Sequence, residues 1–326
     1  MGKRGDGKLP SLLIEADTLA GGWHKAMIEC YNKGVRATDP GYQNKPFLSY
    51  DADINIHVSA PLEEPLKHRF AVYDDDRGIM QYILEVTHGI HNHWKRNLND
   101  PTDTRWGYTY NERFAPQIPF LLARIKQDWE KKKDLSSRKY SFAIWRPKED
   151  VILEQPDPPC WQRGHLRFLQ DDKEEWHLNY ITEWRSRDLA KAWNENNIAQ
   201  VRLMKLIADK TSDMLEIPIN IGAYIDKSSS LHIYGRYFEE GIEKMLAQLI
   251  KMPVASIGMP LFMNDETQLK RLIAAQTDAE NKGLGKNLSE SGLRELKYDL
   301  DNFPYPKDWD SWPKEWDMPL DKSTLK

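Results

Sequence analysis

Apolar residues recur at helical spacing in several stretches of the chain. Leu19, Trp23, Met27 and Tyr31 follow one another every four residues, which places them on one face of a helix that can end at Gly34. Similar spacing predicts four further helices, at residues 78–88, 118–131, 196–214 and 237–251. The apolar stripe in 196–214 is the broadest, so we expect this helix to pack against the core.

Alternation of apolar and polar residues predicts the strands. Residues 54–58 read Ile-Asn-Ile-His-Val, the pattern of a strand with one buried face. Further strands are predicted at residues 140–145, 167–169, 178–184, 223–225 and 231–234. We expect two hairpins among them, one closed by the acidic turn 171–175 and one by residues 226–230.

The order of these elements fits one α+β domain better than two domains. The chain has 326 residues, enough for one large core, and it shows no internal repeat and no clear linker. We therefore expect an N-terminal arm at residues 1–18, followed by one domain over residues 19–326.

Charge and hydropathy argue against two classes of partner. Lys and Arg number 46 and Asp and Glu 50, so a net charge of −4 leaves no broad basic surface for a nucleic acid. No apolar run approaches the roughly 18 residues that a membrane span needs, and residues 1–10 lack the apolar stretch of a secretory signal. Two cysteines do not make a disulfide framework in a chain of this length, so we expect a reducing, cytoplasmic setting.

Cys160 is the first candidate for chemistry. It follows Pro158 and Pro159, which stiffen the chain that leads into the thiol. A nucleophilic cysteine needs a lowered pKa, and guanidiniums such as those of Arg185 and Arg187 can supply it when they lie nearby. The alternative is a buried structural cysteine, the commonest fate of a free one.

Two cationic pairs are candidates for an anion site. Arg185 and Ser186 offer a planar guanidinium and a hydroxyl, a combination that suits phosphate oxygens. Arg138 and Lys139 open a predicted strand. The alternatives are a surface ion pair between Arg185 and a neighbouring carboxylate such as Asp188, and an ordinary polar strand end for the second pair.

Four other side chains have both a structural and a functional interpretation. Asn196 begins a predicted helix, so it is either an N-cap or an amide that matches the donor and acceptor edge of a pyrimidine. His232 and Tyr234 lie two residues apart on a predicted strand and point to one face, either as a half-buried pair or as ligand contacts. Glu85 lies among the inward-facing residues of the helix 78–88, where the alternative is a solvated carboxylate.

Taken in chain order, these residues resemble thymidylate synthase and its relatives, the pyrimidine nucleotide hydroxymethylases. That family has Ser-Arg-Arg, then Pro-Cys, Arg-Ser-x-Asp, Asn and His-Ile-Tyr. The corresponding residues here are Ser137-Arg138-Lys139, Pro159-Cys160, Arg185-Ser186-Arg187-Asp188, Asn196 and His232-Ile233-Tyr234. Upstream, Glu85 falls where the family keeps a helix glutamate, and Tyr108-Thr109-Tyr110 resembles its Tyr-Gly segment. The resemblance implies an α+β fold with a twisted mixed β-sheet, flanking helices and a homodimer whose interface is the sheet.

The resemblance also implies a reaction. Cys160 would attack C6 of the pyrimidine, and C5 would take a one-carbon unit from 5,10-methylenetetrahydrofolate without a metal. Glu85 and Tyr110 would belong to the catalytic group, with Glu85 organising proton transfer. Asp188 would order the pterin of the folate, and Trp106 would contact the folate. The C-terminal tail would close over the site.

Phosphate binding is implied for residues of two subunits. Arg185 and Ser186 would bind the 5′-phosphate, and Arg138 and Lys139 would reach it from the other subunit of a dimer. Arg36 is the candidate for a further phosphate-binding arginine near the N-terminus, although no arginine-rich motif surrounds it.

The base and the sugar would be read by residues near the helix start and on the late strand. Asn196 would contact O4 and N3–H of uracil, which favours dUMP, although the adjacent Asn197 permits a shift of one residue. Asp is typical of this position in dCMP hydroxymethylases, because a protonated acid suits cytosine. His232 and Tyr234 would hold the 3′-hydroxyl of the sugar.

Several positions depart from the family pattern. Trp161 follows the nucleophile where synthases usually have His, and Trp184 stands where they have Gln. Lys139 replaces an Arg, and no Gly-Asp precedes His232. Three functions therefore remain open: a divergent thymidylate synthase that converts dUMP to dTMP, a hydroxymethylase of dUMP, dCMP or CMP, and an inactive nucleotide- or RNA-binding homologue.

Overall fold

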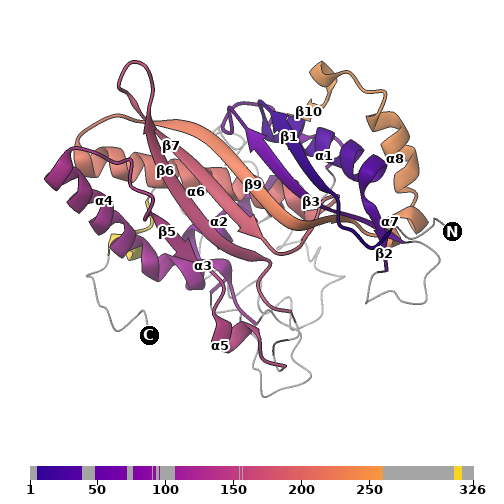
Figure 1. The fold of residues 1–326 in the computed structure, drawn as a ribbon, viewed down its shortest axis with the longest axis horizontal. Coiled ribbons are helices and arrows are strands. Elements are labelled where there is room, and N and C mark those ends of the chain that lie inside the picture. The colour runs from indigo at the N-terminus through magenta and orange to yellow at the C-terminus, as the bar shows by residue number, and fades with distance from the viewer. Residues whose placement is uncertain are drawn as a thin grey trace, which may run out of the picture.

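The fold is built around one mixed β-sheet (Figure 1). The computed structural model describes residues 6–38, 48–71, 76–89, 91–92, 95, 107–153, 155, 157–259 and 312–317. The strands are β1 (Ser11–Ala16), β2 (Val35–Ala37), β3 (Ser49–Val58), β4 (Lys67–His68), β5 (Ser141–Ala143), β6 (Trp161–Gln170), β7 (Trp176–Trp184), β8 (Arg187–Asp188), β9 (Ile219–Ile233) and β10 (Gly258–Met259). The α-helices are α1 (Leu19–Lys33), α2 (Asp76–His88), α3 (Tyr110–Phe114), α4 (Ile118–Lys132), α5 (Pro147–Asp150), α6 (Ala192–Leu215), α7 (Arg236–Glu239) and α8 (Ile242–Leu249).

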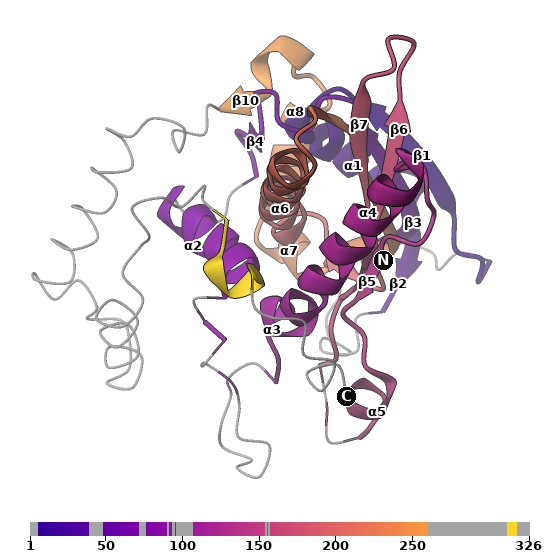
Figure 2. The ribbon, with the colours of Figure 1, turned by 90° about the vertical axis from the view of Figure 1, so that its left-hand side faces the viewer.

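The main sheet has the strand order β1-β3-β9-β7-β6-β5, with β2 beside β3 and β8 beside β9. Strand β1 is parallel to β3, and β7 and β8 are parallel to β9, while the other neighbouring strands are antiparallel. Helices α2, α4 and α6 lie together on one side of the sheet (Figure 2). The expected α+β fold, with a mixed sheet and flanking helices, is therefore confirmed.

Side-chain alternation explains why the sheet has one apolar face. Along β3, Ala52, Ile54, Ile56 and Val58 are fully buried, and the residues between them are only half-buried. Four tryptophans are completely buried in the same core: Trp23, Trp161, Trp184 and Trp193. The indole of Trp23 donates a hydrogen bond to the carbonyl of Leu189 at 2.8 Å, which ties α1 to the chain just after β8.

The predicted hairpin of residues 223–225 and 231–234 is wrong. Residues 219–233 form one continuous strand, β9, that pairs with β3 on one side and with β7 and β8 on the other. The polar residues in the middle suggested a turn, but Asp226 and Ser228 are fully buried and hydrogen-bonded to Arg187. Burial of a satisfied polar group thus mimics the sequence pattern of a loop.

Two other boundaries differ from the sequence-based expectation. Helix α6 begins at Ala192, so Asn196 lies inside its second turn and is not an N-cap. Residues 11–16, expected within the N-terminal arm, form β1 and pair with β3 from Ser11 opposite Asp53 to Ala16 opposite Val58. The hairpin of β6 and β7 through the acidic turn is confirmed.

A buried histidine pair joins α1 to β4 and the start of α6. His24 Nδ1 and His68 Nε2 lie 3.2 Å apart, and the backbone N–H of Phe70 donates to His68 Nδ1 at 3.0 Å. Since Nδ1 of His68 accepts that bond, Nε2 must carry the proton and donate it to His24. Asn194 accepts from the backbone N–H of His68 at 3.2 Å and donates to the carbonyl of Leu66 at 2.9 Å.

This pair predicts a loss of stability in mild acid. Burial, aided by the neighbouring His24 and Arg69, lowers the pKa of His68 from 6.5 to about 3. The unfolded chain therefore binds a proton that the folded chain excludes, so stability is full above pH 6.5 and falls as the pH drops toward 3. The slope contributed by one proton is at most about 1.4 kcal/mol per pH unit. Urea unfolding across this range should be less pH-dependent in His68→Gln than in the wild type; equal slopes for the two proteins would refute this role of His68.

Candidate active site

One cavity of about 620 Å³ opens beside the start of β6. It is formed by α2, the residues that lead into α3, strand β8, the first turns of α6 and the end of β9. Pockets of roughly 300–1,000 Å³ accept ligands the size of a nucleotide. The residues singled out from the sequence that line this cavity are Glu85, Tyr110, Cys160, Ser186, Asp188, Asn196, His232 and Tyr234.

Cys160 lies immediately before β6 and is half-buried. The backbone N–H of Arg185 donates to the Cys160 carbonyl at 2.8 Å, so the thiol-bearing residue is fixed against the end of β7. Burial raises the pKa of the Cys160 thiol above 9.0, Arg185 and Arg187 oppose that shift, and Asp157 adds to it. The thiol is therefore mainly protonated near neutral pH.

The side chain of Arg185 is directed at the loop before Cys160. Its Nε donates to the carbonyl of Pro159 at 3.0 Å, and its Nη2 contacts the carbonyl of Pro158 and lies 3.4 Å from Asp157. Asp188, which the sequence suggested as its ion-pair partner, is bonded instead to Lys191 and Tyr237. The adjacent Ser186 lines the cavity.

Asp188 is held in place by two donors. The backbone N–H of Lys191 donates to Oδ1 at 3.0 Å, and the hydroxyl of Tyr237 donates to Oδ2. Burial and the carboxylate of Asp188 raise the pKa of Tyr237, which keeps this hydroxyl a donor. At the end of the neighbouring strand β9, the rings of His232 and Tyr234 meet edge to face with their centroids 4.3 Å apart.

Glu85 and Tyr110 reach the cavity from different helices. Glu85 Oε1 lies 2.7 Å from Nδ1 of His91, a residue that also lines the cavity. The ring of Tyr110 packs edge-on against Trp161 at 5.6 Å and Trp184 at 5.8 Å. Burial, more than any neighbouring group, raises the pKa of Tyr110, so its hydroxyl stays protonated.

The two neighbouring asparagines of α6 have different surroundings. Asn196 is half-buried and lines the cavity. Asn197 is fully buried, and its Oδ1 accepts from Arg187 Nη1 at 3.0 Å and from the Tyr224 hydroxyl at 2.7 Å. Its Nδ2 has no hydrogen-bond partner among the residues that the structure describes. The expectation that Asn196 faces the ligand is consistent with this geometry.

Other predicted site residues do not line this cavity. The guanidinium of Arg36, on β2, stacks 3.5 Å from the centroid of the Tyr50 ring. Arg138 and Lys139 are exposed in the segment before β5. Trp106 lies outside the described residues.

Part of the C-terminal segment that was expected to close over the site packs on α3 and α6. Trp316 is buried and meets the ring of Phe114 at 5.8 Å, and Phe114 in turn packs on Trp161 at 5.5 Å. Asp317 forms an ion pair with Lys210 of α6 at 2.7 Å. Residues 303–309, which belong to the same predicted tail, are outside the described residues.

Lining residues that the sequence analysis did not name include Tyr82, His91 and Glu195. His91 and Tyr82 have no motif around them, so nothing in the sequence separates them from surface or core residues. Arg187 stands at the variable position of Arg-Ser-x-Asp. From the sequence it was named only as one of the guanidiniums that could lower the pKa of Cys160, and the structure places it on β8 at the cavity.

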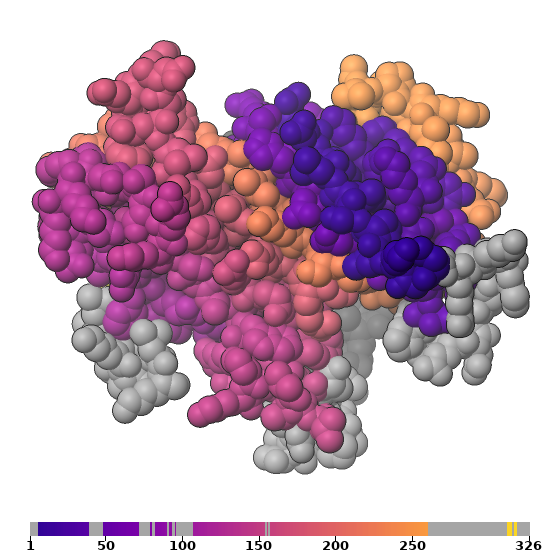
Figure 3. All heavy atoms as spheres, viewed as in Figure 1, coloured from indigo at the N-terminus to yellow at the C-terminus, as the bar shows by residue number. Residues whose placement is uncertain are grey.

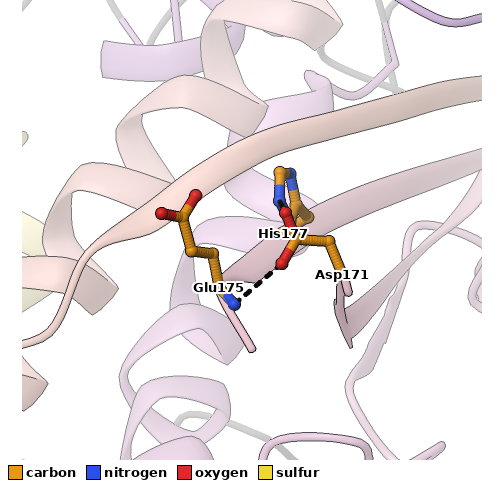
Figure 4. A group of neighbouring side chains, drawn as sticks. All are labelled: Asp171, Glu175 and His177. Carbon is orange, nitrogen blue, oxygen red and sulfur yellow. Dashed lines mark hydrogen bonds and ion pairs between the residues drawn. The ribbon is translucent and has the colours of Figure 1, made fainter. Parts of the chain in front are cut away.

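One group with metal-ligand geometry lies away from the cavity, at the turn between β6 and β7. Single ligand atoms of Asp171, Glu175 and His177 lie within 4.8 Å of one another (Figure 4). Asp171 Oδ1 accepts from the backbone N–H groups of Lys173 and Glu175, both at 2.9 Å, and His177 is 3.3 Å from Oδ2. These hydrogen bonds stabilise the turn, so they account for the cluster without a metal. The turn projects beyond the body of the sheet (Figures 1 and 3).

Comparisons with known proteins give matches among solved structures and none among sequences. No protein-family model matches the chain, and no curated protein sequence matches it. Among solved structures, a thermostable thymidylate synthase A from Bacillus subtilis is similar, with 14% sequence identity and a TM-score of 0.45 over 72% of this chain and 85% of that one. At this level the likeness carries no weight for activity. Within the described residues, no helix has the length and apolar content to cross a membrane.

The two cysteines should differ sharply in reactivity. Cys30 is fully buried between the carbonyls of Tyr50 and Leu231, and burial raises the pKa of its thiol to about 12. Iodoacetamide should therefore modify Cys160 alone in the native protein, faster as the pH rises. Asp157→Asn should accelerate the reaction roughly two- to fivefold, because it removes a charge that raises the thiol pKa.

Peptide mass spectrometry of the time course provides the measurement, with Asp172→Asn at the exposed hairpin turn as the control. Labelling of Cys30 before Cys160 would contradict the predicted difference in reactivity. A slower reaction in Asp157→Asn would show that Asp157 does not raise the pKa of the Cys160 thiol.

Proposed function

We propose that the protein transfers a one-carbon unit to C5 of a pyrimidine nucleotide, with dUMP as substrate and dTMP as product. The supporting observation is the cavity in which Cys160 meets Ser186, Asp188 and Asn196, residues whose order in the chain resembles thymidylate synthase. A thiol, a hydroxyl, a carboxylate and an amide around one space suit covalent catalysis on a polar heterocycle.

Cys160 is the proposed nucleophile. Its sulfur would form a bond to C6 of uracil, and the C5=C6 electron pair would move toward O4, which makes C5 nucleophilic. The guanidinium of Arg185 favours the thiolate that this step requires, and burial of Cys160 opposes it.

The phosphate site proposed here is shared between subunits. Ser186 lies at the cavity wall, and Arg185 is adjacent to it, anchored through the carbonyl of Pro159. Arg138 and Lys139 are exposed and do not line the cavity of their own chain, which fits their proposed action in the site of a second copy. Arg36 packs on Tyr50 and is left out of the proposed phosphate site.

Asn196 is proposed to read the base, with His232 and Tyr234 at the sugar. An amide can donate to O4 and accept from N3–H of uracil, whereas the cytosine edge presents the opposite polarity at these two atoms. The edge-to-face contact of His232 and Tyr234 fixes both rings beside the cavity, so their polar atoms are oriented before a sugar hydroxyl arrives.

The residues at the cavity fit 5,10-methylenetetrahydrofolate as the second substrate. It would supply the carbon and, in a synthase, the hydride. The carboxylate of Asp188, already oriented by Lys191 and Tyr237, suits the N–H donors of a pterin. Glu85, paired with His91, would order the water that carries protons, and the hydroxyl of Tyr110 would donate within the same space.

A homodimer belongs to this proposal. The sheet face opposite the helices carries half-buried side chains, among them a row across four strands formed by His57, Ile225, Ile181 and His165. Two copies of such a face can stack about a two-fold axis. We propose that strand β1 and residues 19–326 together act as one catalytic domain in each subunit.

Tritium release from C5 tests the reaction. With dUMP tritiated at C5 and methylenetetrahydrofolate, the wild-type protein should release tritium to water. Cys160→Ala should lower the rate at least roughly 1,000-fold, since loss of a covalent nucleophile costs that much or more, while Cys30→Ser should retain it. No release from dUMP, dCMP or CMP by the wild type would refute the function. The absorbance of dihydrofolate separates the two enzymes. If dihydrofolate forms, the protein is a synthase; if a hydroxymethylated product forms without it, the protein is a hydroxymethylase.

The base preference should depend on one of two adjacent residues. Asn196→Asp should shift the ratio of kcat/KM for dUMP and dCMP toward cytosine by roughly tenfold or more, because a protonated acid presents the complementary edge. Asn197→Asp should leave the ratio unchanged, since that side chain is engaged by Arg187 and Tyr224. A switch caused by Asn197→Asp alone would assign base recognition to Asn197.

A further inference from the structure

Arg187 is a buried cation at the cavity that the proposed reaction leaves without a role. Its residue is 3% exposed, and it lines the same cavity as Cys160. It occupies the variable position of the Arg-Ser-x-Asp segment, so the resemblance to a known family assigns it nothing. A buried guanidinium is costly unless it is paired, which makes its surroundings informative.

Three partners from two elements hold the guanidinium. Nη2 forms an ion pair with Asp226 and donates to Ser228 Oγ at 2.9 Å, and Nη1 donates to Asn197 Oδ1 at 3.0 Å. Ser228 also donates to Asp226 Oδ1 at 2.8 Å, so the carboxylate is bonded from both sides. Strand β9 and helix α6 thus fix the position of this charge.

The ring beneath Arg187 connects it to the nucleophile. The guanidinium carbon lies 4.0 Å from the centroid of the Trp184 ring. Trp184 is stacked on Trp161 with centroids 5.9 Å apart and an interplanar angle of 21°, and the two residues are opposite each other in the β6–β7 ladder. Trp161 directly follows Cys160 in the chain. The ring pair that packs under the Arg187 guanidinium therefore also fixes the residue next to the thiol.

The ion pair is oriented with respect to the cavity. Arg187 lines the cavity, whereas Asp226 is fully buried and does not. The pair therefore presents its positive member to the cavity that Cys160 also lines. Both members are buried, so their field is screened less than that of a surface pair.

We propose that Arg187 is a positioning residue that stabilises the thiolate of Cys160, and that Asp226 limits how strongly it does so. The residue acts on the nucleophile through space and does not itself touch the reacting atoms. The consequence for turnover rests on the proposed function, whereas the effect on the thiol does not.

Other charges face the thiol and must be separated from this effect. Burial is the largest influence on the pKa of Cys160 and raises it; Arg185 lowers it, Asp157 raises it, and Arg187 lowers it. The remaining titratable groups that line the cavity are Tyr82, Glu85, His91, Tyr108, Tyr110, Asp188, Glu195, His232 and Tyr234. Arg185 is hydrogen-bonded to Asp157 and to two carbonyls of the loop before Cys160. Arg187 is therefore the arginine whose side chain lines the cavity itself.

The test is the pH dependence of Cys160 alkylation in the absence of any nucleotide. Arg187→Met should raise the midpoint by about 0.5 to 1 pH unit and slow the reaction at neutral pH about three- to tenfold. Arg187→Lys keeps the charge and should remain closer to the wild type, and Asp226→Asn should lower the midpoint. The control is Arg163→Met, which removes an arginine of β6 that pairs with Glu183 at 2.7 Å on the exposed face.

A second variant covers the case in which Arg187→Met does not fold, because Asp226 would then be buried without a partner. Arg187→Met/Asp226→Asn removes both charges, a change that buried pairs often tolerate. Its midpoint should still rise, by less than in the single variant. A wild-type midpoint in either folded variant, checked by circular dichroism, overturns the inference. Shifted midpoints in a protein that releases no tritium would leave this inference standing and refute the proposed function.

Discussion

The register between β6 and β7 is the constraint on which the candidate site depends. These two strands place Trp161 opposite Trp184 and bring the carbonyl of Cys160 to within 2.8 Å of the Arg185 N–H. Because side chains alternate along a strand, a shift of β6 by one residue would turn Trp161 out of the core and displace the adjacent thiol. The stacked rings fill the interior at that point and make such a shift costly, so core packing and site geometry are specified by the same contact.

Much of this arrangement could be predicted from the sequence, because it depends on local patterns. The spacing of Leu19, Trp23 and Met27 predicted a helix that the structure has at Leu19–Lys33. The acidic turn at 171–175 predicted the hairpin of β6 and β7. The order of Cys160, Ser186 and Asn196 led to residues that do line one cavity. In each case the signal is either the periodicity of apolar residues along one element or a short motif of polar and reactive residues.

What the sequence could not provide are the contacts between distant elements. Asp226 and Ser228 read as part of a turn, and only the partner Arg187 explains how a strand can bury them. Similarly, the pairing of Glu85 with His91 at 2.7 Å depends on where the chain goes after α2, which no periodicity records. The direction of Arg185 toward Pro159 is set by a loop conformation, so the sequence suggested Asp188 as the ion-pair partner where the structure has Asp157.

Because Cys30 is buried, Cys160 is the one cysteine of the two that a thiol reagent can reach in the folded protein. With the Cys30 sulfur enclosed between two backbone carbonyls, a maleimide dye or spin label would attach at a single place, the mouth of the cavity beside Cys160. A reporter there would sense occupancy of the cavity and the approach of neighbouring chain segments from one defined position. The same asymmetry means that an oxidant would modify Cys160 at the cavity before it modified Cys30 in the core.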